Sequence, residues 1–280
     1  MRMLCHVFVV AAALSAPAFG QEDRFEARLT EVKGSVTIFV PGGDPEGLAA
    51  EKDMPLEEGD RLKTGADGYA EAAFEGESVV VLKANSQLTV NATRKAGSEL
   101  HLGFGSLLAK IGSLLGGSGF RVRTPTAVCA VRGTEFGLEV AGEAEGGETA
   151  VGVFDEGKVE VTAAEGGEPE RLMMNQETVV RRGERPLPPY VLKRLMRHRN
   201  SVRGLGRRIS QLKKRWASLT PEKRVELRQR WMERSREKMK QLKEKAQQRR
   251  IRRQGPSGPH PSQEKMEKRR QRILRDRKKP

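Results

Sequence analysis

The feature that most constrains this chain is an abrupt reversal of charge near residue 180. The 280 residues carry a formal net charge of +15, which hides two opposite segments. Counting Lys and Arg against Asp and Glu gives −13 for residues 21–180 and +27 for residues 181–280. A change of that size predicts a domain boundary, so the acidic and the basic segments require separate explanations.

The first twenty residues have the pattern of an export signal. Arg2 precedes an apolar run over Val7–Ala16, and small residues follow at Ala18 and Gly20. An apolar run of about 7–15 residues is typical of a signal peptide, whereas a membrane-spanning helix needs about 20. We therefore predict a signal peptide at residues 1–20 and a mature chain without a transmembrane segment. This places the protein in the periplasm or at the cell surface of a bacterium.

Residues 25–182 show the pattern of an all-β domain. Short segments of alternating or β-branched residues recur, among them 79–82, 120–123 and 158–161. Turns that contain glycine separate them at intervals of about 8–12 residues, which is typical of a sandwich, a barrel or a solenoid. Val, Leu and Phe dominate one face of the predicted strands, and polar residues dominate the other.

An ordered series of motifs lies within this segment. It runs from Gly59–Ala70 through Phe120–Ala127 to Val131–Phe136. In order and spacing the series resembles the FecR domain family, named for the periplasmic part of ferric-citrate-type iron-signalling regulators, over roughly residues 30–180. The resemblance implies a twisted, solenoid-like all-β domain that contacts other proteins. Those regulators have a cytoplasmic segment and a membrane span before the domain, so we do not expect transmembrane signalling from a chain that begins with a cleavable signal.

The resemblance identifies nine motif positions, for which we expect a structural role. Thr124-Pro125 is expected to be extended, because proline disfavours the α conformation in the residue before it. Gly133 is expected to supply a backbone angle or a close approach that other residues resist. Arg132 can bond strand-end carbonyls with its planar guanidinium, and we favour such an internal clamp over a ligand contact. The nine positions are Gly68, Thr124, Pro125, Ala127, Val131, Arg132, Gly133, Thr134 and Phe136.

The basic C-terminal part divides into three segments. Three prolines mark residues 183–189 as a linker, because proline resists both helix and central strand. Residues 190–254 are predicted to be a basic helical segment, in which Thr220-Pro221-Glu222 has the pattern of a helix start. Residues 255–280 are predicted to be a disordered or frayed basic tail.

Two tryptophans are the candidate anchors of this basic part. Trp216 begins a segment that resembles, weakly, the W-x-x-L-[ST]-P-E-x-R unit of small exported bacterial proteins of unassigned function. Trp231 belongs to a narrow apolar stripe at helical spacing. We favour a helix–helix or coiled-coil seam for the stripe, with membrane-interface anchoring and base stacking as alternatives. The stripe comprises Leu227, Trp231, Met239, Leu242 and Ala246.

The excess positive charge of the C-terminal part indicates either an anionic partner or a solvated tail that has no partner. Nucleic acid is not expected to be that partner, because the chain is predicted to be exported. Three partners fit that compartment: an anionic lipid or lipopolysaccharide surface, an acidic protein, or the chain's own acidic β domain. A solvated tail without a partner is the remaining alternative.

The sequence shows no catalytic or cofactor motif. His101, His198 and His260 have no neighbours at metal-ligand spacing, and no nucleophile elbow, Walker loop or dinucleotide fingerprint is present. We therefore predict a protein that is not an enzyme and has no cofactor. Its expected function is an envelope binding or scaffold protein, whose β domain contacts a protein partner and whose tail binds an anionic one. The alternative is a periplasmic sensor or regulatory module that binds a small ligand or a transporter peptide.

Overall fold

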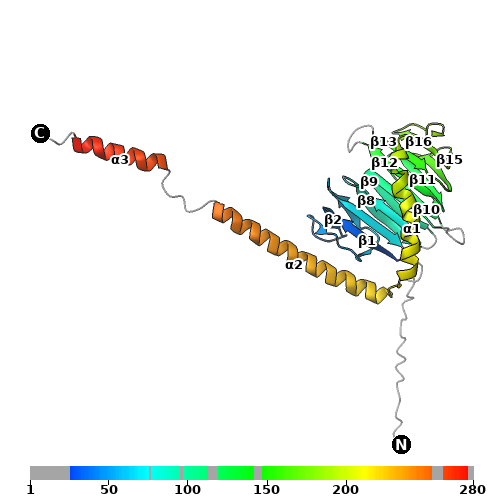
Figure 1. The fold of residues 1–280 in the computed structure, drawn as a ribbon, viewed down its shortest axis with the longest axis horizontal. Helices are drawn as coiled ribbons and strands as arrows, with labels where there is room; N and C mark the ends of the chain where they lie inside the picture. Colours follow the sequence, from blue (N-terminus) through cyan, green and yellow to red (C-terminus); the bar gives the residue numbers. More distant parts are fainter. Residues whose placement is uncertain are drawn as a thin grey trace, which may run out of the picture. The chain divides into compact units, whose positions relative to one another are not determined.

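The computed structural model describes residues 26–75, 77–94, 97–112, 119–141, 147–253 and 261–276. The predicted signal peptide lies outside these residues. Two compact units, Met1–Gln229 and Arg230–Pro280, are described separately below. The chain is mostly β-sheet with a helical C-terminal region, as the sequence predicts (Figure 1).

The described strands of the first unit form two layers that share the long strand β9 (Gly97–Lys110). Neighbouring strands pair antiparallel, except β9 and β10, which are parallel. Sheet A contains, in spatial order, β3 (Leu48–Ala49), β2 (Val36–Phe39), β5 (Arg61–Thr64), β8 (Gln87–Arg94), β9, β10 (Gly119–Arg123), β11 (Ala127–Arg132), β14 (Lys158–Ala163) and β15 (Glu170–Met173). Sheet B contains β4 (Pro55–Leu56), β1 (Ala27–Lys33), β6 (Tyr69–Phe74), β7 (Ser78–Leu82), β9, β12 (Glu135–Ala141), β13 (Glu148–Val153), β16 (Gln176–Arg181) and β17 (Tyr190–Val191).

Strand β9 passes from one sheet to the other at Gly105. Its first part pairs with β8 and β10, and its last part pairs with β7 and β12. Gly105 has a φ of +92°, and a Cβ there would lie 2.2 Å from Oγ of Ser86. The Ser86 hydroxyl instead accepts the backbone N–H of Ser106 at 2.9 Å. Only glycine combines this backbone angle with this close approach, so Gly105 sets the bend between the two layers.

The hydrophobic core fills the space between the two layers. Along β10, Phe120 and Val122 are buried while the alternate residues face outward, as a period of two requires. Phe120 of sheet A meets Phe74 of sheet B edge to face, with ring centroids 5.7 Å apart. Thr126, which follows β10, hydrogen-bonds Thr149 of sheet B at 2.7 Å. The layers therefore pack face to face.

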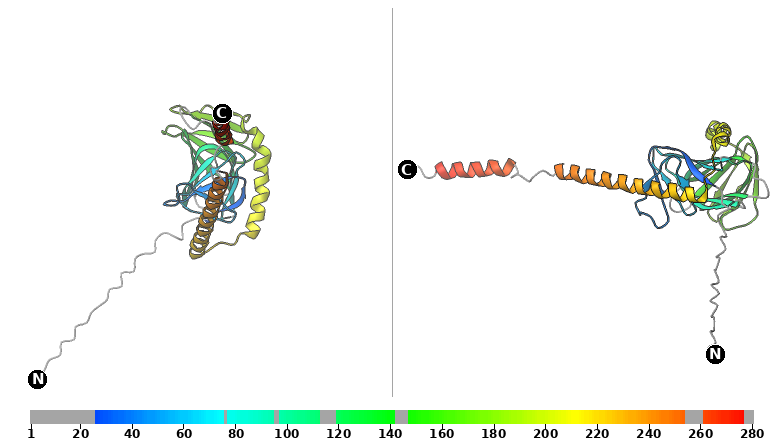
Figure 2. Two further views of the ribbon diagram at one scale, coloured as in Figure 1. Left: turned by 90° about the vertical axis from the view of Figure 1, so that its left-hand side faces the viewer. Right: turned by 90° about the horizontal axis from the view of Figure 1, so that it is seen from below.

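Helix α1 (Arg199–Arg215) covers the outer face of sheet B, preceded by the 3₁₀ turn η2 (Leu195–His198). Both views of Figure 2 show α1 along one side of the strands. Its buried residues recur at helical spacing, so they form a single apolar stripe in an otherwise basic helix. The stripe packs on a cluster that comprises Ala73, Val79, Val81, Leu108, Ala150, Phe154, Val179, Leu192, Leu195, Val202, Leu205 and Ile209. This helix, which lies within the predicted basic segment, therefore completes the β domain.

Two glycine substitutions test this packing. A Cβ at Gly152 of β13 would lie 2.7 Å from Leu192 and 2.8 Å from Leu195, both of which are fully buried. We expect Gly152→Ala to lower the free energy of unfolding by about 1–3 kcal/mol, because the core has no room to yield. A Cβ at Gly204 of α1 meets nothing within 4 Å, so Gly204→Ala is expected to raise that energy by about 0.5–1 kcal/mol. Urea unfolding measures both, and equal stabilities for the two variants would contradict the packing of α1 on sheet B.

The second unit contains the greater part of α2 (Pro221–Arg253) and α3 (Pro261–Asp276). Helix α2 begins where the sequence predicts, with the Thr220 hydroxyl accepting the backbone N–H of Lys223 at 3.3 Å. The predicted seam stays a prediction: Trp231 is buried, Ala246 is exposed, and the side chain of Leu242 lies outside the described part. No helix of the described ranges is long and apolar enough to cross a membrane. Disorder at residues 255–260 and 277–280 also stays a prediction, because those residues are not described.

Candidate functional site

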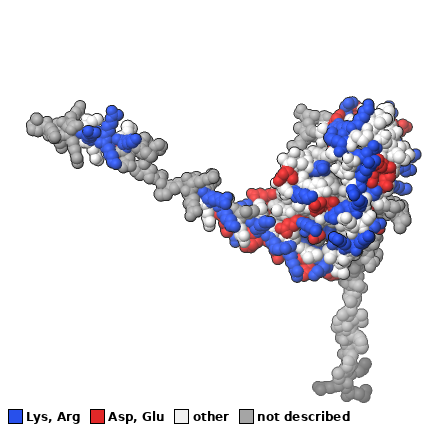
Figure 3. Space-filling view, in the orientation of Figure 1, with Lys and Arg blue, Asp and Glu red and all other residues white. Residues whose placement is uncertain are grey.

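The two sheets differ in what covers their outer faces. The outer face of sheet B is buried by α1, and Lys and Arg lie beside Asp and Glu on that side of the molecule (Figure 3). The outward side chains of sheet A, called the open face below, carry exposed basic residues instead. Seven described strand residues of the open face are basic and two are acidic: Arg61, Lys63, Arg121, Arg123, Arg132, Lys158 and Arg171 against Glu99 and Glu160. The open face is thus positive in the part of the chain that is acidic as a whole.

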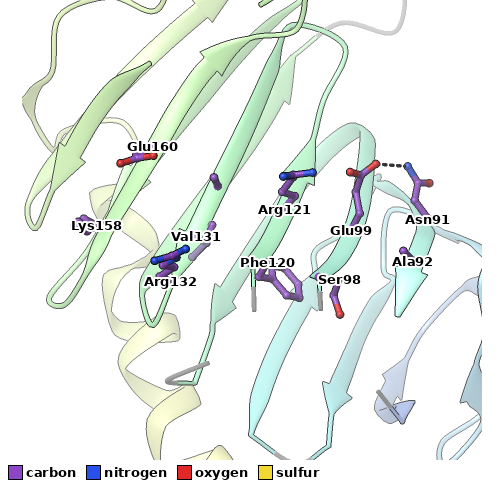
Figure 4. Close-up of a pocket in the computed structure, with 13 residues that line it drawn as sticks. Asn91, Ala92, Ser98, Glu99, Phe120, Arg121, Val131, Arg132, Lys158 and Glu160 are labelled. Atoms are coloured by element: carbon purple, nitrogen blue, oxygen red, sulfur yellow. Dashed lines mark hydrogen bonds between the residues drawn. The ribbon is translucent and has the colours of Figure 1, made fainter. Parts of the chain in front are cut away.

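A hollow of about 660 Å³ lies on the open face across β8, β9, β10, β11 and β14. Its lining includes small residues at Ala92, Gly97, Gly119 and Ala130, and Ala130 is exposed. Because these positions lack long side chains, the surface is depressed between the larger residues that surround it. Figure 4 shows those larger residues, among them Arg121, Arg132, Lys158, Glu99 and Glu160.

The acidic residues of the hollow are engaged by partners. Asn91 Nδ2 donates to Glu99 Oε1 at 3.2 Å, and Arg123 Nε donates to the same oxygen at 2.9 Å. Glu160 accepts a hydrogen bond from Arg171 at 3.1 Å. The bonds from Arg123 and Arg171 are charge-assisted, so they neutralise both carboxylates from outside the hollow.

The basic residues of the hollow, unlike the acidic ones, have no partner of opposite charge within the described part of the chain. Within the described part of the chain, no carboxylate lies within 4.0 Å of the charged nitrogens of Arg121, Arg132 or Lys158. Arg132 of β11 and Lys158 of β14 are direct cross-strand partners. Like charges opposite each other on one face of a sheet repel. The hollow therefore has an excess of positive charge.

Several motif positions hold the turns at the two ends of β11. Between β10 and β11, the Thr124 hydroxyl accepts the backbone N–H of Ala127 at 2.9 Å, and Pro125 is exposed. Gly133 has a φ of +59°, in the left-handed region that favours glycine. The Thr134 hydroxyl donates to the carbonyl of Lys158 at 2.9 Å.

The remaining motif positions lie in the core, at a separate turn or in the hollow. Val131 and Phe136 are buried between the layers. A Cβ at Gly68 would lie 2.4 Å from the carbonyl oxygen of Ser35, so this position fits only glycine. The Arg132 side chain is exposed and lines the hollow. The backbone carbonyl of Arg132 accepts a hydrogen bond from the Thr134 hydroxyl at 3.1 Å.

The two candidate anchors lie in different units. Trp216 packs beside the α1 cluster, and the Arg28 guanidinium lies 3.9 Å from its ring centroid. Arg28 also donates to the carbonyl of Ala217 at 2.8 Å. Trp231 belongs to the second unit and is 2% exposed.

Sequence reasoning left open how the basic part pairs with the acidic domain. Arg228 donates through both terminal nitrogens to the fully buried Asp60, at 2.8 and 2.5 Å. Arg208 of α1 donates to the buried Glu71 at 2.7 Å. Asp155 accepts from Arg203, and this bond lowers the pKa of Asp155.

Three basic side chains cluster around Glu139 on the covered face of sheet B. Arg194 Nε donates to Glu139 at 3.2 Å, His198 Nε2 lies 2.8 Å from it, and Arg197 also hydrogen-bonds it. Burial alone would raise the pKa of Glu139. The hydrogen bond with His198, the charge of Arg197 and the hydrogen bond from Arg194 outweigh it and lower that pKa to about 2. The apolar stripe of α1 is the sequence signal that locates these basic residues on the acidic domain.

Comparison with known proteins gives one family match. Residues 60–160 match the family described as FecR protein. No curated protein matches the sequence. Two crystal structures of a protein from Parabacteroides distasonis ATCC 8503, proposed to be an anti-sigma factor, are similar to part of this chain, with 22% identity and TM-scores of 0.40 and 0.41. The similarity covers 48% of this chain and 61% of each of those chains.

Proposed function

Because residues 60–160 form a FecR domain, we propose that this chain is a non-catalytic binding protein of the bacterial cell envelope. A FecR domain indicates a regulatory or sensor module, and a protein that docks a partner at the envelope fits within that role. The first unit presents the open face to a protein partner. The second unit holds the protein at an anionic surface.

The partition of charge between the two units carries this proposal. Residues 21–180 have a net charge of −13 and residues 181–229 have +13, so the first unit without the predicted signal is neutral. Residues 230–280 carry +14, close to the whole excess of the chain. The net charge of the first unit is thus zero, whereas the second unit carries a large net positive charge.

The second unit has the features of an electrostatic tether. Its described side chains at 236–238, 240–241, 243–249 and 265–273 are exposed, and most of them are basic. Near an anionic lipid surface each Lys or Arg contributes about 1 kcal/mol, and this attraction fades within a Debye length. A segment of +14 can therefore bind such a surface without a folded pocket, and salt is expected to release it.

The state of Cys129 supports the non-catalytic part of the proposal. Cys129 lies in β11 and is fully buried. Burial raises the pKa of its thiol to about 12, so the thiol is neutral at physiological pH. Cys129 therefore acts as a small core residue.

Co-sedimentation with vesicles tests the tether. We expect the full chain to pellet with phosphatidylglycerol vesicles at low salt, to be released at high salt, and to ignore phosphatidylcholine vesicles. A chain that ends at Gln229 is expected to lose this binding, because it lacks the +14 segment. The full-length tail variant Arg234→Gln/Arg236→Gln/Lys240→Gln is expected to bind at least about tenfold more weakly, from the loss of three surface contacts.

A matched variant on the first unit supplies the control. The hollow variant Arg121→Gln/Arg132→Gln/Lys158→Gln also removes three exposed positive charges, and it is expected to bind the vesicles like the full chain. Equal vesicle binding by the chain that ends at Gln229 would show that the first unit, and not the second, binds the surface. Such a result would end the tether proposal.

A further inference from the structure

We propose that the hollow on the open face docks an acidic segment of a partner protein, with one carboxylate of that segment between Arg132 and Lys158. This inference rests on the proposed function, because it takes the first unit as the part that is presented to a partner. It adds the chemistry of that partner and the residues that recognise it.

The balance of charge within the hollow is the first argument. Glu99 and Glu160 are neutralised by Arg123 and Arg171, which extend from outside the hollow. Arg121, Arg132 and Lys158 have no carboxylate at ion-pair distance in the described ranges. A ligand in the hollow therefore faces uncompensated positive charge, which favours carboxylate groups over neutral or cationic ones.

The cross-strand pair of Arg132 and Lys158 is the second argument. A like-charged pair at facing positions costs stability when it has no counterion. A carboxylate between the two side chains replaces that repulsion with two charge-assisted hydrogen bonds. Arg121 lies on the next strand, β10, where it pairs with Ala130 of β11. It is then available to a second carboxylate of the same segment.

The size and the floor of the hollow favour a peptide over an inorganic anion. Its volume of about 660 Å³ lies within the range of about 300–1,000 Å³ that is usual for pockets that bind organic ligands. Its lining also contains the apolar side chains of Ala92 and Ala130, neither of which is buried. A peptide that alternates acidic and apolar side chains can satisfy both the basic residues and this floor. A phosphate ion can satisfy only the basic residues.

The experiment uses two full-length variants and one designed probe. The probe is a short fluorescein-labelled peptide of alternating Glu and Val, and its counterpart with Gln in place of Glu is the control ligand. Fluorescence anisotropy at physiological salt is expected to show binding of the Glu peptide and little binding of the Gln peptide. The hollow variant is expected to bind the Glu peptide at least about tenfold more weakly, whereas the tail variant stays within about twofold of the unmodified chain.

Site mapping adds a readout that does not depend on affinity. Zero-length carbodiimide crosslinking joins a lysine amine to a carboxylate, so the Glu peptide is expected to crosslink to Lys158. Crosslinks confined to lysines beyond residue 229, or equal affinity of the hollow variant, would overturn the proposal. Inorganic phosphate or phosphatidylglycerol vesicles could also displace the peptide as efficiently as unlabelled peptide does. That result would assign the hollow to phosphate chemistry and would overturn the proposal as well.

The two proposals fail separately in these experiments. If both variants bind the peptide as tightly as the unmodified chain, and vesicle binding is normal and salt-sensitive, the docking site is wrong and the tether stands. Peptide binding that depends on the hollow, in a protein that does not bind vesicles, removes the tether and leaves the docking site.

Discussion

A chain that ends at Pro189 is expected to be largely unfolded or aggregated, whereas a chain that ends at Gln229 is expected to fold. The shorter chain lacks Leu192, Leu195, Val202, Leu205 and Ile209, all of which are buried on sheet B. Burial of one such side chain contributes about 1.5–3 kcal/mol, so five of them approach the whole stability of a domain, about 5–15 kcal/mol. The shorter chain also exposes the apolar outer face of sheet B, and large apolar patches promote aggregation.

Size-exclusion chromatography and circular dichroism of the two truncated chains measure this difference. The chain that ends at Gln229 is the control, because it lacks the second unit but keeps α1 and the bond between Arg228 and Asp60. We expect it to elute as a single species with a cooperative urea transition. A monomeric, cooperatively folded chain that ends at Pro189 would show that α1 is an accessory and not a part of the domain.

The sequence contains a sign of this covering helix, in the difference between the strands of the two sheets. Strands of sheet A alternate, as in Gly119–Arg123, where Phe120 and Val122 are buried and Arg121 is exposed. Ser78–Leu82 of sheet B is instead a continuous run of buried residues. Such a run is typical of a strand that is buried on both faces. The alternation alone was enough to predict a mostly β domain, and the exception indicates that something covers sheet B.

Local patterns were not enough to predict which residues meet across the chain. Arg194 and Glu139 are 55 positions apart, and Arg228 and Asp60 are 168 positions apart. Contacts of this kind depend on the topology of the sheets and on where α1 packs, and no spacing rule covers them. The hollow is similar: Arg132 and Lys158 face each other because β11 pairs with β14. Motif reasoning assigned Arg132 to an internal clamp, because its neighbours in sequence are apolar.

Glu139→Gln is expected to lower the free energy of unfolding by about 3 kcal/mol at neutral pH. The substitution leaves the positive charge of the partly buried Arg194 beside a neutral amide, and breaking a buried ion pair costs about 3–5 kcal/mol. The pair with Arg197 contributes less, because the Arg197 side chain is 61% exposed. We place the loss at the lower end because Arg194 keeps Glu148 at 2.5 Å. Urea unfolding measures it against Glu184→Gln, whose exposed pair with Arg181 is expected to contribute at most about 1 kcal/mol.

The loss caused by Glu139→Gln is expected to depend on pH. The pKa of this carboxyl is about 2 in the folded protein, against an ordinary value of 4.5. A group whose pKa is lowered by folding stabilises the protein fully above its unfolded pKa, and this contribution fades as the pH falls through the folded pKa. The stability difference between the unmodified chain and Glu139→Gln is therefore expected to be full above about pH 5 and to shrink steadily between pH 4.5 and pH 2. Other carboxylates titrate in both proteins, so the difference isolates Glu139. A difference that stays constant over this range would mean that the substitution acts through packing. The ion pairs with Arg194 and Arg197 and the hydrogen bond with His198 would then not hold η2 and α1 on the sheet.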